Sequence, residues 1–185
     1  TEIARFWTAT TPTVYYPIAR SVANQPGREV TQNARLLAAS GQAMVDGIDA
    51  VFDAKYQYHF WRPFTAIRNG DQDGNDATGR DAAWTPLNAT PMHPEYPSQA
   101  AIIAGVSMGV SEAVFGANPS TPVVASDLID PKAQRRYANV KEMADEVQNV
   151  RIWGGVHFRN SLDVGYQMGQ KIAVFLVENS IKPMN

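Results

Sequence analysis

Three short stretches of the chain carry the side chains with the greatest capacity for chemistry. The first is KYQYHFWRP, in which Lys55 and Arg62 lie seven residues apart. Seven residues are about two turns of an α-helix, so both cations could point the same way. Lys55 also falls on the apolar stripe of its helix, where a cation is costly without an anion. The spacing predicts a shared anion or, alternatively, side chains that reach solvent and complement the end of a helix.

The second stretch is HPEYPSQ, in which a proline-rich turn becomes an apolar helix. Pro97 suits the first position of a helix. A helix that begins there offers free amides and the positive end of its dipole to an anion. The hydroxyl of Ser98 adds a donor. Ordinary helix initiation is the alternative interpretation, and His93 either joins such a site or orders the turn.

The third stretch is RIWGGVHF, which places Arg151 and His157 six residues apart. On one continuous helix their side chains would lie about 120° out of phase. Gly154 and Gly155 instead indicate that one helix ends and another begins. The two side chains could therefore converge from different elements. A buried histidine and a capping arginine are the alternative.

The periodicity of the rest of the chain predicts an all-α helical bundle that positions these stretches. After a short N-terminal segment that ends near residues 11–13, we expect helices over about 14–24, 32–60, 98–115, 132–149 and 159–179. Thr31 is a candidate N-cap and Gly116 a candidate helix-ending glycine. Loops are expected over 68–90 and 117–131, and no stretch has the convincing alternation of a strand.

Length and composition restrict the class of protein. The 185 residues fit one domain, over 1–185, which could be the C-terminal part of a longer precursor. A net charge of −2 gives no indication of nucleic acid or an anionic membrane as a partner. No apolar run approaches the roughly 20 residues that span a bilayer. The absence of cysteine excludes disulfides and thiol chemistry, and the three histidines lack zinc spacing.

Taken in order, the three stretches resemble the signature of the type 2 phosphatidic acid phosphatase and vanadium-dependent haloperoxidase superfamily. That signature is Lys-x6-Arg-Pro, then Pro-Ser-Gly-His, then Ser-Arg-x5-His. Flanking segments such as TEIARFW and GGVHFRNS make the soluble haloperoxidase-like branch the nearest resemblance. It covers nearly the whole chain but only the C-terminal half of a typical member. A companion chain that supplies the N-terminal half, or a homo-oligomer, is therefore compatible with it.

The resemblance implies a helical bundle with a pocket for vanadate, in which phosphate could occupy the same site. Carried over residue by residue, the cofactor-binding set would be Lys55, Arg62, Ser98, the backbone amide of Gln99, Arg151 and His157. His157 would be the metal ligand, or would attack phosphorus in a phosphatase. The implied catalytic groups are His157, His93 and Lys55, and the small-molecule partners are hydrogen peroxide, halide and an organic acceptor.

The chain departs from the family pattern next to the serine. Gln99 and Ala100 stand where the family has glycine and its acid–base histidine, and Val150 stands where it has serine. Acid–base help is typically worth 10²–10⁴-fold, and His93, which matches a second histidine of bromide-oxidising members, could replace part of it. Three functions remain open: a haloperoxidase, a phosphomonoesterase on the same site, and a non-catalytic oxyanion-binding descendant. The resemblance alone suggests a secreted or periplasmic protein.

Overall fold

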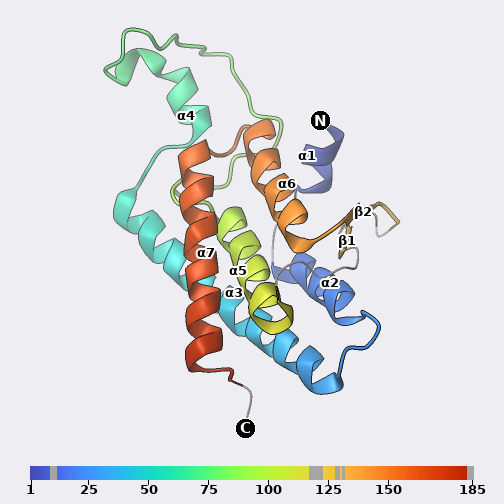
Figure 1. Cartoon of the computed structure of the whole chain (residues 1–185). Helices are drawn as coiled ribbons and strands as arrows, with labels where there is room; N and C mark the ends of the chain where they lie inside the picture. Colours follow the sequence, from blue (N-terminus) through green and yellow to red (C-terminus); the bar gives the residue numbers. More distant parts are fainter. Residues whose placement is uncertain (9–11, 117–122, 128–129, 131, 183–185) are drawn as a thin grey trace.

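A computed structural model of the chain describes residues 1–8, 12–116, 123–127, 130 and 132–182 (Figure 1). These residues form a helical bundle with one small hairpin, as the sequence predicts apart from the strands. The helices are α1 (Glu2–Phe6), α2 (Pro12–Ala23), α3 (Val30–Tyr58), α4 (Pro63–Arg68), α5 (Gln99–Phe115), α6 (Val140–Trp153) and α7 (Arg159–Asn179). A 3-10 turn, η1 (Gly70–Gln72), follows α4, and the strands are β1 (Val123–Ser126) and β2 (Gln134–Tyr137).

Helix α5 is the centre of the bundle. Every residue from Ala100 to Ser111 is buried, because the helix is apolar on all sides rather than along one stripe. Figure 1 shows α5 enclosed by α3, α6 and α7. The residues of α5 join those of the surrounding helices in one hydrophobic core. Over the described ranges, the structure contains no helix with the length and apolar character needed to cross a bilayer.

The closest approach in the bundle is between α5 and α7, and it depends on glycine. A Cβ added at Gly169 would lie 2.0 Å from the carbonyl oxygen of Ile102, and one added at Gly105 would lie 2.1 Å from that of Tyr166. Both positions are inside helices, where glycine is about 1 kcal/mol less favourable than alanine. The two glycines are therefore needed for packing.

Helix α3 begins and ends earlier than the sequence suggests. Glu29, not Thr31, is the N-cap, because Glu29 and Gln32 form a reciprocal capping box. The helix ends at Tyr58, two residues before the expected end, where His59 adopts a left-handed conformation with φ of 49°. The chain leaves the helix there and re-enters a helix at Pro63. Lys55 and Arg62 consequently belong to different elements.

The region between α5 and α6 differs from the sequence prediction. Strands β1 and β2 pair antiparallel, with Val123 opposite Tyr137, where a loop and the start of a helix were expected. Alternate residues of β1 are buried, but four residues are too few for this alternation to stand out in the sequence. Helix α6 therefore begins at Val140 rather than near Lys132, with Asn139 as a side-chain cap. At the other end of the chain, α2 begins within the 11–13 segment that was expected to end a helix.

Two helix boundaries that matter for the site agree with the sequence. Ser98 caps α5 by accepting a hydrogen bond from the amide of Ala101 at 3.4 Å, and the helix ends before Gly116. Pro97, however, lies before the cap rather than at the first helical position. The glycine pair does separate two helices: α6 ends at Trp153, four residues beyond the expected 149, with Gly154 as its C-cap and Gly155 next at φ of +73°, and α7 begins at the expected residue.

We expect Gly169→Ala to lower the free energy of unfolding by about 2 kcal/mol or more, since its Cβ would overlap a backbone carbonyl that cannot move aside easily. Urea unfolding followed by circular dichroism would measure the change. Gly79→Ala is the matched control, because no atom lies within 4 Å of the added Cβ, and its effect should stay within about 0.5 kcal/mol. Equal stability of the two variants would contradict the close approach.

Candidate active site

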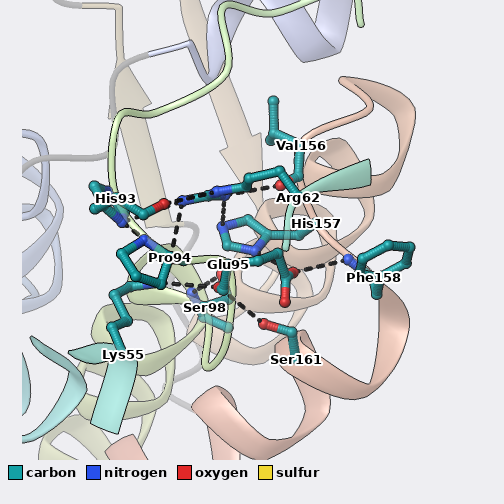
Figure 2. A network of polar contacts seen from close by, with 11 residues as sticks. Lys55, Arg62, His93, Pro94, Glu95, Ser98, Val156, His157, Phe158 and Ser161 are labelled. Carbon is teal, nitrogen blue, oxygen red and sulfur yellow. Dashed lines mark hydrogen bonds and ion pairs between the residues drawn. The ribbon is translucent and has the colours of Figure 1, made fainter. Parts of the chain in front are cut away.

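The segment from His93 to Ser98 lies where α3, the start of α4, the start of α5 and the α6–α7 junction meet (Figure 2). Lys55, in the last turn of α3, is fully buried beneath it. Its Nζ donates to the carbonyl oxygens of Pro94 at 2.8 Å and Glu95 at 2.9 Å. The backbone of the turn therefore supplies the acceptors that this buried cation needs.

Arg62 caps α4 from the other side of the same turn and is 5% exposed. Its Nη1 donates to the carbonyl oxygen of Val156 at 2.8 Å and lies 3.2 Å from Nε2 of His157. Its Nη2 lies 3.1 Å from Nδ1 of His93, and its Nε donates to the carbonyl oxygen of the same residue. A guanidinium group can only donate. Nε2 of His157 must therefore be an acceptor. Nδ1 of His93 lies between this guanidinium and the carbonyl oxygen of Pro94 at 3.2 Å, which can only accept, so its contacts are compatible with either tautomer.

The proton of His157 is fixed by a buried carboxylate. Its Nδ1 lies 2.6 Å from Oε1 of Glu95, which also accepts from the backbone amide of Phe158 at 3.0 Å. Because Nε2 accepts from Arg62, Nδ1 carries the proton and donates it to the carboxylate. Figure 2 shows the imidazole between the guanidinium and the carboxylate. This arrangement presents the lone pair of Nε2 toward the cationic side of the site.

Burial governs the charges of these groups. It lowers the pKa of His157 to about 4, against the opposing effect of Glu95, so the imidazole is neutral near pH 7. Burial alone would raise the pKa of Glu95, but the hydrogen bonds from His157 and Phe158 hold it below its usual value. The carboxylate is therefore ionised. The imidazole is therefore neutral beside an ionised carboxylate, and its Nε2 is unprotonated, with a lone pair that accepts from Arg62.

The two cations lack a full complement of negative charge. Burial, together with the neighbouring Arg62, lowers the pKa of Lys55 to about 7. Burial lowers the pKa of Arg62 to about 10. The one carboxylate among their charged neighbours is Glu95, which already accepts bonds from His157 and Phe158. An anion placed here would favour the charged form of both side chains.

The structure thus brings together Lys55, Arg62, His93 and His157 from three separate stretches of sequence. Ser98 is fully buried at the start of α5, and its backbone amide donates to the carbonyl oxygen of Ser161. The first residue of α5 is Gln99, so its amide is among the free donors of the helix start. Over the described residues, no group of three or more His, Cys, Asp or Glu side chains is arranged to hold a metal cation.

Arg151 is buried in the last turn of α6 but bonds elsewhere. Its Nη2 donates to the carbonyl oxygen of Trp7, and its Nε has no acceptor among the described residues. Burial lowers its pKa, and Tyr15 is the neighbour that partly opposes this. The structure does not bring Arg151 into the network of Figure 2. Its expected role as an oxyanion ligand remains a prediction.

Glu95 is the residue of this network that sequence reasoning missed. It lies in the quoted HPEYPSQ stretch, three residues before the helix cap. An acidic residue in a proline-rich turn is usually exposed, and nothing in its spacing indicates a partner 62 residues away. Its complete burial and its contact with His157 are tertiary features.

Comparison with known proteins identifies the relatives of this arrangement. The sequence model of the family described as "VCPO second helical-bundle domain" matches residues 35–185. A bacterial vanadium-dependent iodoperoxidase matches with a TM-score of 0.80 and 28% identity, over 95% of this chain and 42% of that chain. A holo-type bacterial vanadium-dependent chloroperoxidase has a TM-score of 0.69 and 19% identity, over 92% and 41% of the two chains.

The apo-type bacterial vanadium-dependent chloroperoxidase gives a TM-score of 0.66 and 20% identity, over 91% of this chain and 42% of that chain. The comparison with curated proteins finds no match. The chain therefore spans less than half the length of the solved structures that it resembles. At 19–20% identity, the two chloroperoxidase structures support the fold and nothing finer.

We expect acid to destabilise the protein through His157. Between pH 6.5 and about 4 the unfolded histidine binds a proton, whereas the folded one does not. The unfolded state therefore binds more protons in this window, and the free energy of unfolding falls as the pH falls. The contribution of His157 is roughly 3–4 kcal/mol over the whole window, at about 1.4 kcal/mol per pKa unit.

Urea unfolding at a series of pH values would measure this slope. His157→Gln should reduce it, whereas the control His59→Asn, at an exposed position outside the network, should retain it. Below the window, Glu95 acts in the same direction, because its carboxylate has a lowered pKa in the folded state. An unchanged slope in His157→Gln would show that the buried imidazole is not held neutral.

Proposed function

Because the chain belongs to the VCPO second helical-bundle domain family, we propose that it binds vanadate and acts as a vanadate-dependent haloperoxidase that oxidises halide with hydrogen peroxide. The observation that carries the proposal is a pair of buried cations, Lys55 and Arg62, beside the unprotonated Nε2 of His157. Phosphate, which has the same tetrahedral shape and charge, would occupy the same site.

The donors of the site suit an oxyanion. An ammonium group has three donors, and Lys55 uses two of them on backbone carbonyls. The hydroxyl of Ser98 accepts from Ala101 and keeps its own proton as a donor. The start of α5 adds backbone amides and a positive dipole. Together with Arg62 and the Gln99 amide, these groups would hold the oxyanion.

The protein contributes charge and orientation to the reaction. Bound vanadate would supply a Lewis-acidic centre that activates hydrogen peroxide toward halide. Glu95 keeps the proton of His157 on Nδ1, so that Nε2 is the nitrogen offered to the oxyanion. Lys55 and Arg62 are held by backbone carbonyls and need not rearrange to stabilise negative charge.

His93 is the imidazole that would move a proton in place of the missing family histidine. Its Nδ1 lies between a donor, the guanidinium of Arg62 at 3.1 Å, and an acceptor, the carbonyl oxygen of Pro94 at 3.2 Å, so either ring nitrogen can carry the proton. The ring packs edge-on against Phe52, with centroids 5.2 Å apart. Burial lowers the pKa of His93, so the imidazole is neutral near pH 7 and would act there as a base. The methyl group of Ala100, which is 4% exposed, has no such capacity.

Two other functions compete with this proposal. The neutral His157 with Glu95 behind it is also the arrangement that activates an imidazole to attack phosphorus, which favours a phosphomonoesterase. Ala100 favours an oxyanion-binding protein without turnover. Hydrolysis of p-nitrophenyl phosphate that vanadate inhibits would support the first alternative. Tight binding of vanadate or phosphate with no turnover in either assay would support the second.

We expect the protein to bind vanadate and to brominate a phenolic dye once vanadate and hydrogen peroxide are supplied. Lys55→Met keeps the apolar stem and removes the buried charge, so vanadate affinity should fall at least about tenfold. Isothermal titration calorimetry would measure binding. Lys171→Met, at an exposed position of α7, is the control and should bind as the parent does. Absence of halogenation from acid to neutral pH after reconstitution with vanadate would refute the haloperoxidase.

We expect Ala100→His to raise the turnover number by about 10²-fold, at the lower end of what acid–base help typically contributes. The control is Ala100→Leu, which adds volume at the same buried position without a titratable group. Thermal unfolding and vanadate affinity of both variants would separate catalysis from damage to the fold. In the Ala100→His background, His93→Gln should cost less activity than in the parent. Equal turnover in the histidine and leucine variants would mean that another step limits the rate.

A further inference from the structure

A cavity of about 600 Å³ adjoins the network on the side of Glu95 and Ser161. This volume lies within the range of small-molecule sites. Five aromatic side chains line it together with Asp73, Asn160 and Ala66; the five are Tyr58, Phe60, Trp61, Tyr96 and Phe158. They come from the end of α3, the segment between α3 and α4, the proline-rich turn and the start of α7.

The two oxygens of the Glu95 carboxylate differ: one accepts hydrogen bonds within the network, and the other has no partner among the described residues. Oε1 accepts from His157 and Phe158, whereas Oε2 is buried and has no hydrogen-bond donor among the described residues. Figure 2 shows this second oxygen directed away from the imidazole, on the side of Ser161. Leaving a buried acceptor unpaired costs about 1–3 kcal/mol. A ligand in the cavity that donates to Oε2 would recover that cost.

The other walls of the cavity favour positive charge in such a ligand. Tyr58 packs edge-to-face against Tyr96, and Phe60 packs edge-to-face against Phe158, with centroids 5.2 and 5.9 Å apart. Aromatic faces attract cations. The lining residues include two carboxylates, those of Glu95 and Asp73, and no lysine, arginine or histidine. These two carboxylates would repel an anionic ligand. A neutral ligand would donate a weaker hydrogen bond to Oε2 of Glu95 than a charged one.

We propose that this cavity binds an organic ammonium ion, with its N–H donors on Oε2 of Glu95 and its hydrocarbon part against the aromatic walls. The ligand would occupy the side of the carboxylate opposite to the oxyanion site. Binding therefore needs neither vanadate nor turnover. Failure of the halogenation assay would leave this site untouched, and failure of ammonium binding would leave the oxyanion site untouched.

The test compares three ligands of one shape in the protein without vanadate: benzylammonium, benzyl alcohol and benzoate. We expect saturable binding of benzylammonium by titration calorimetry, at least about tenfold weaker binding of benzyl alcohol because its hydrogen bond lacks charge, and none of benzoate. Binding should shift the indole N–H signal of Trp61 in the NMR spectrum, assigned by its loss in Trp61→Phe. Equal affinity for the alcohol, or no saturable binding of the ammonium ion, would overturn the proposal.

Matched variants locate the site. Asp73→Asn and Phe60→Leu should each weaken benzylammonium binding severalfold. The controls Asp76→Asn and Phe175→Leu change an exposed acid and an exposed aromatic residue that do not line the cavity. Glu95→Gln should weaken binding most, and Asp73→Asn, at an exposed position, keeps the test valid if that buried variant does not fold. Equal effects of Phe60→Leu and Phe175→Leu would mean that the ligand binds elsewhere.

Discussion

The site depends on keeping two cations, Lys55 and Arg62, away from water without a full set of counter-charges. The proline-rich turn makes this possible by aiming successive backbone carbonyls at them: those of His93, Pro94 and Glu95 all accept bonds from the two side chains. Proline has a carbonyl but no N–H, so it adds an acceptor without a donor that must also be satisfied. The turn thus solvates the cations while leaving their net charge for a ligand.

The packing of α5 on α7 fixes this turn in place. The close approach through Gly105 and Gly169 continues to the ends of the two helices, where a Cβ at Gly165 would lie 2.6 Å from the carbonyl oxygen of Ser98. The amide of Ser98 donates to the carbonyl of Ser161, whose hydroxyl donates to the carbonyl of Glu95. The position of the carboxylate is therefore set by the same helix pair that forms the core of the bundle.

The parts of this arrangement that sequence could predict are those encoded locally. Helix α7 follows from its periodicity, and the start of α5 follows from a serine after a proline. The grouping of Lys55, Arg62 and His157 was expected only from the family resemblance of the three stretches, because their spacing alone left each of them with another interpretation. Contacts between residues that lie far apart in the sequence leave no such local signal. The pairing of Glu95 with His157 and the bond from Arg151 to Trp7, 144 residues apart, depend on how whole elements pack. The four-residue strands pair too briefly to leave an alternating pattern.

The low pKa of Lys55 gives the site a dependence on its ligand. Near pH 7 this lysine is close to its midpoint, because burial and Arg62 both disfavour its charge. A bound oxyanion would reverse that balance and raise its pKa. Protonation of Lys55 and binding of the oxyanion therefore favour each other, as linkage requires. Arg62, whose pKa stays near 10, is charged in either case. The site holds one permanent positive charge and gains a second when an anion arrives.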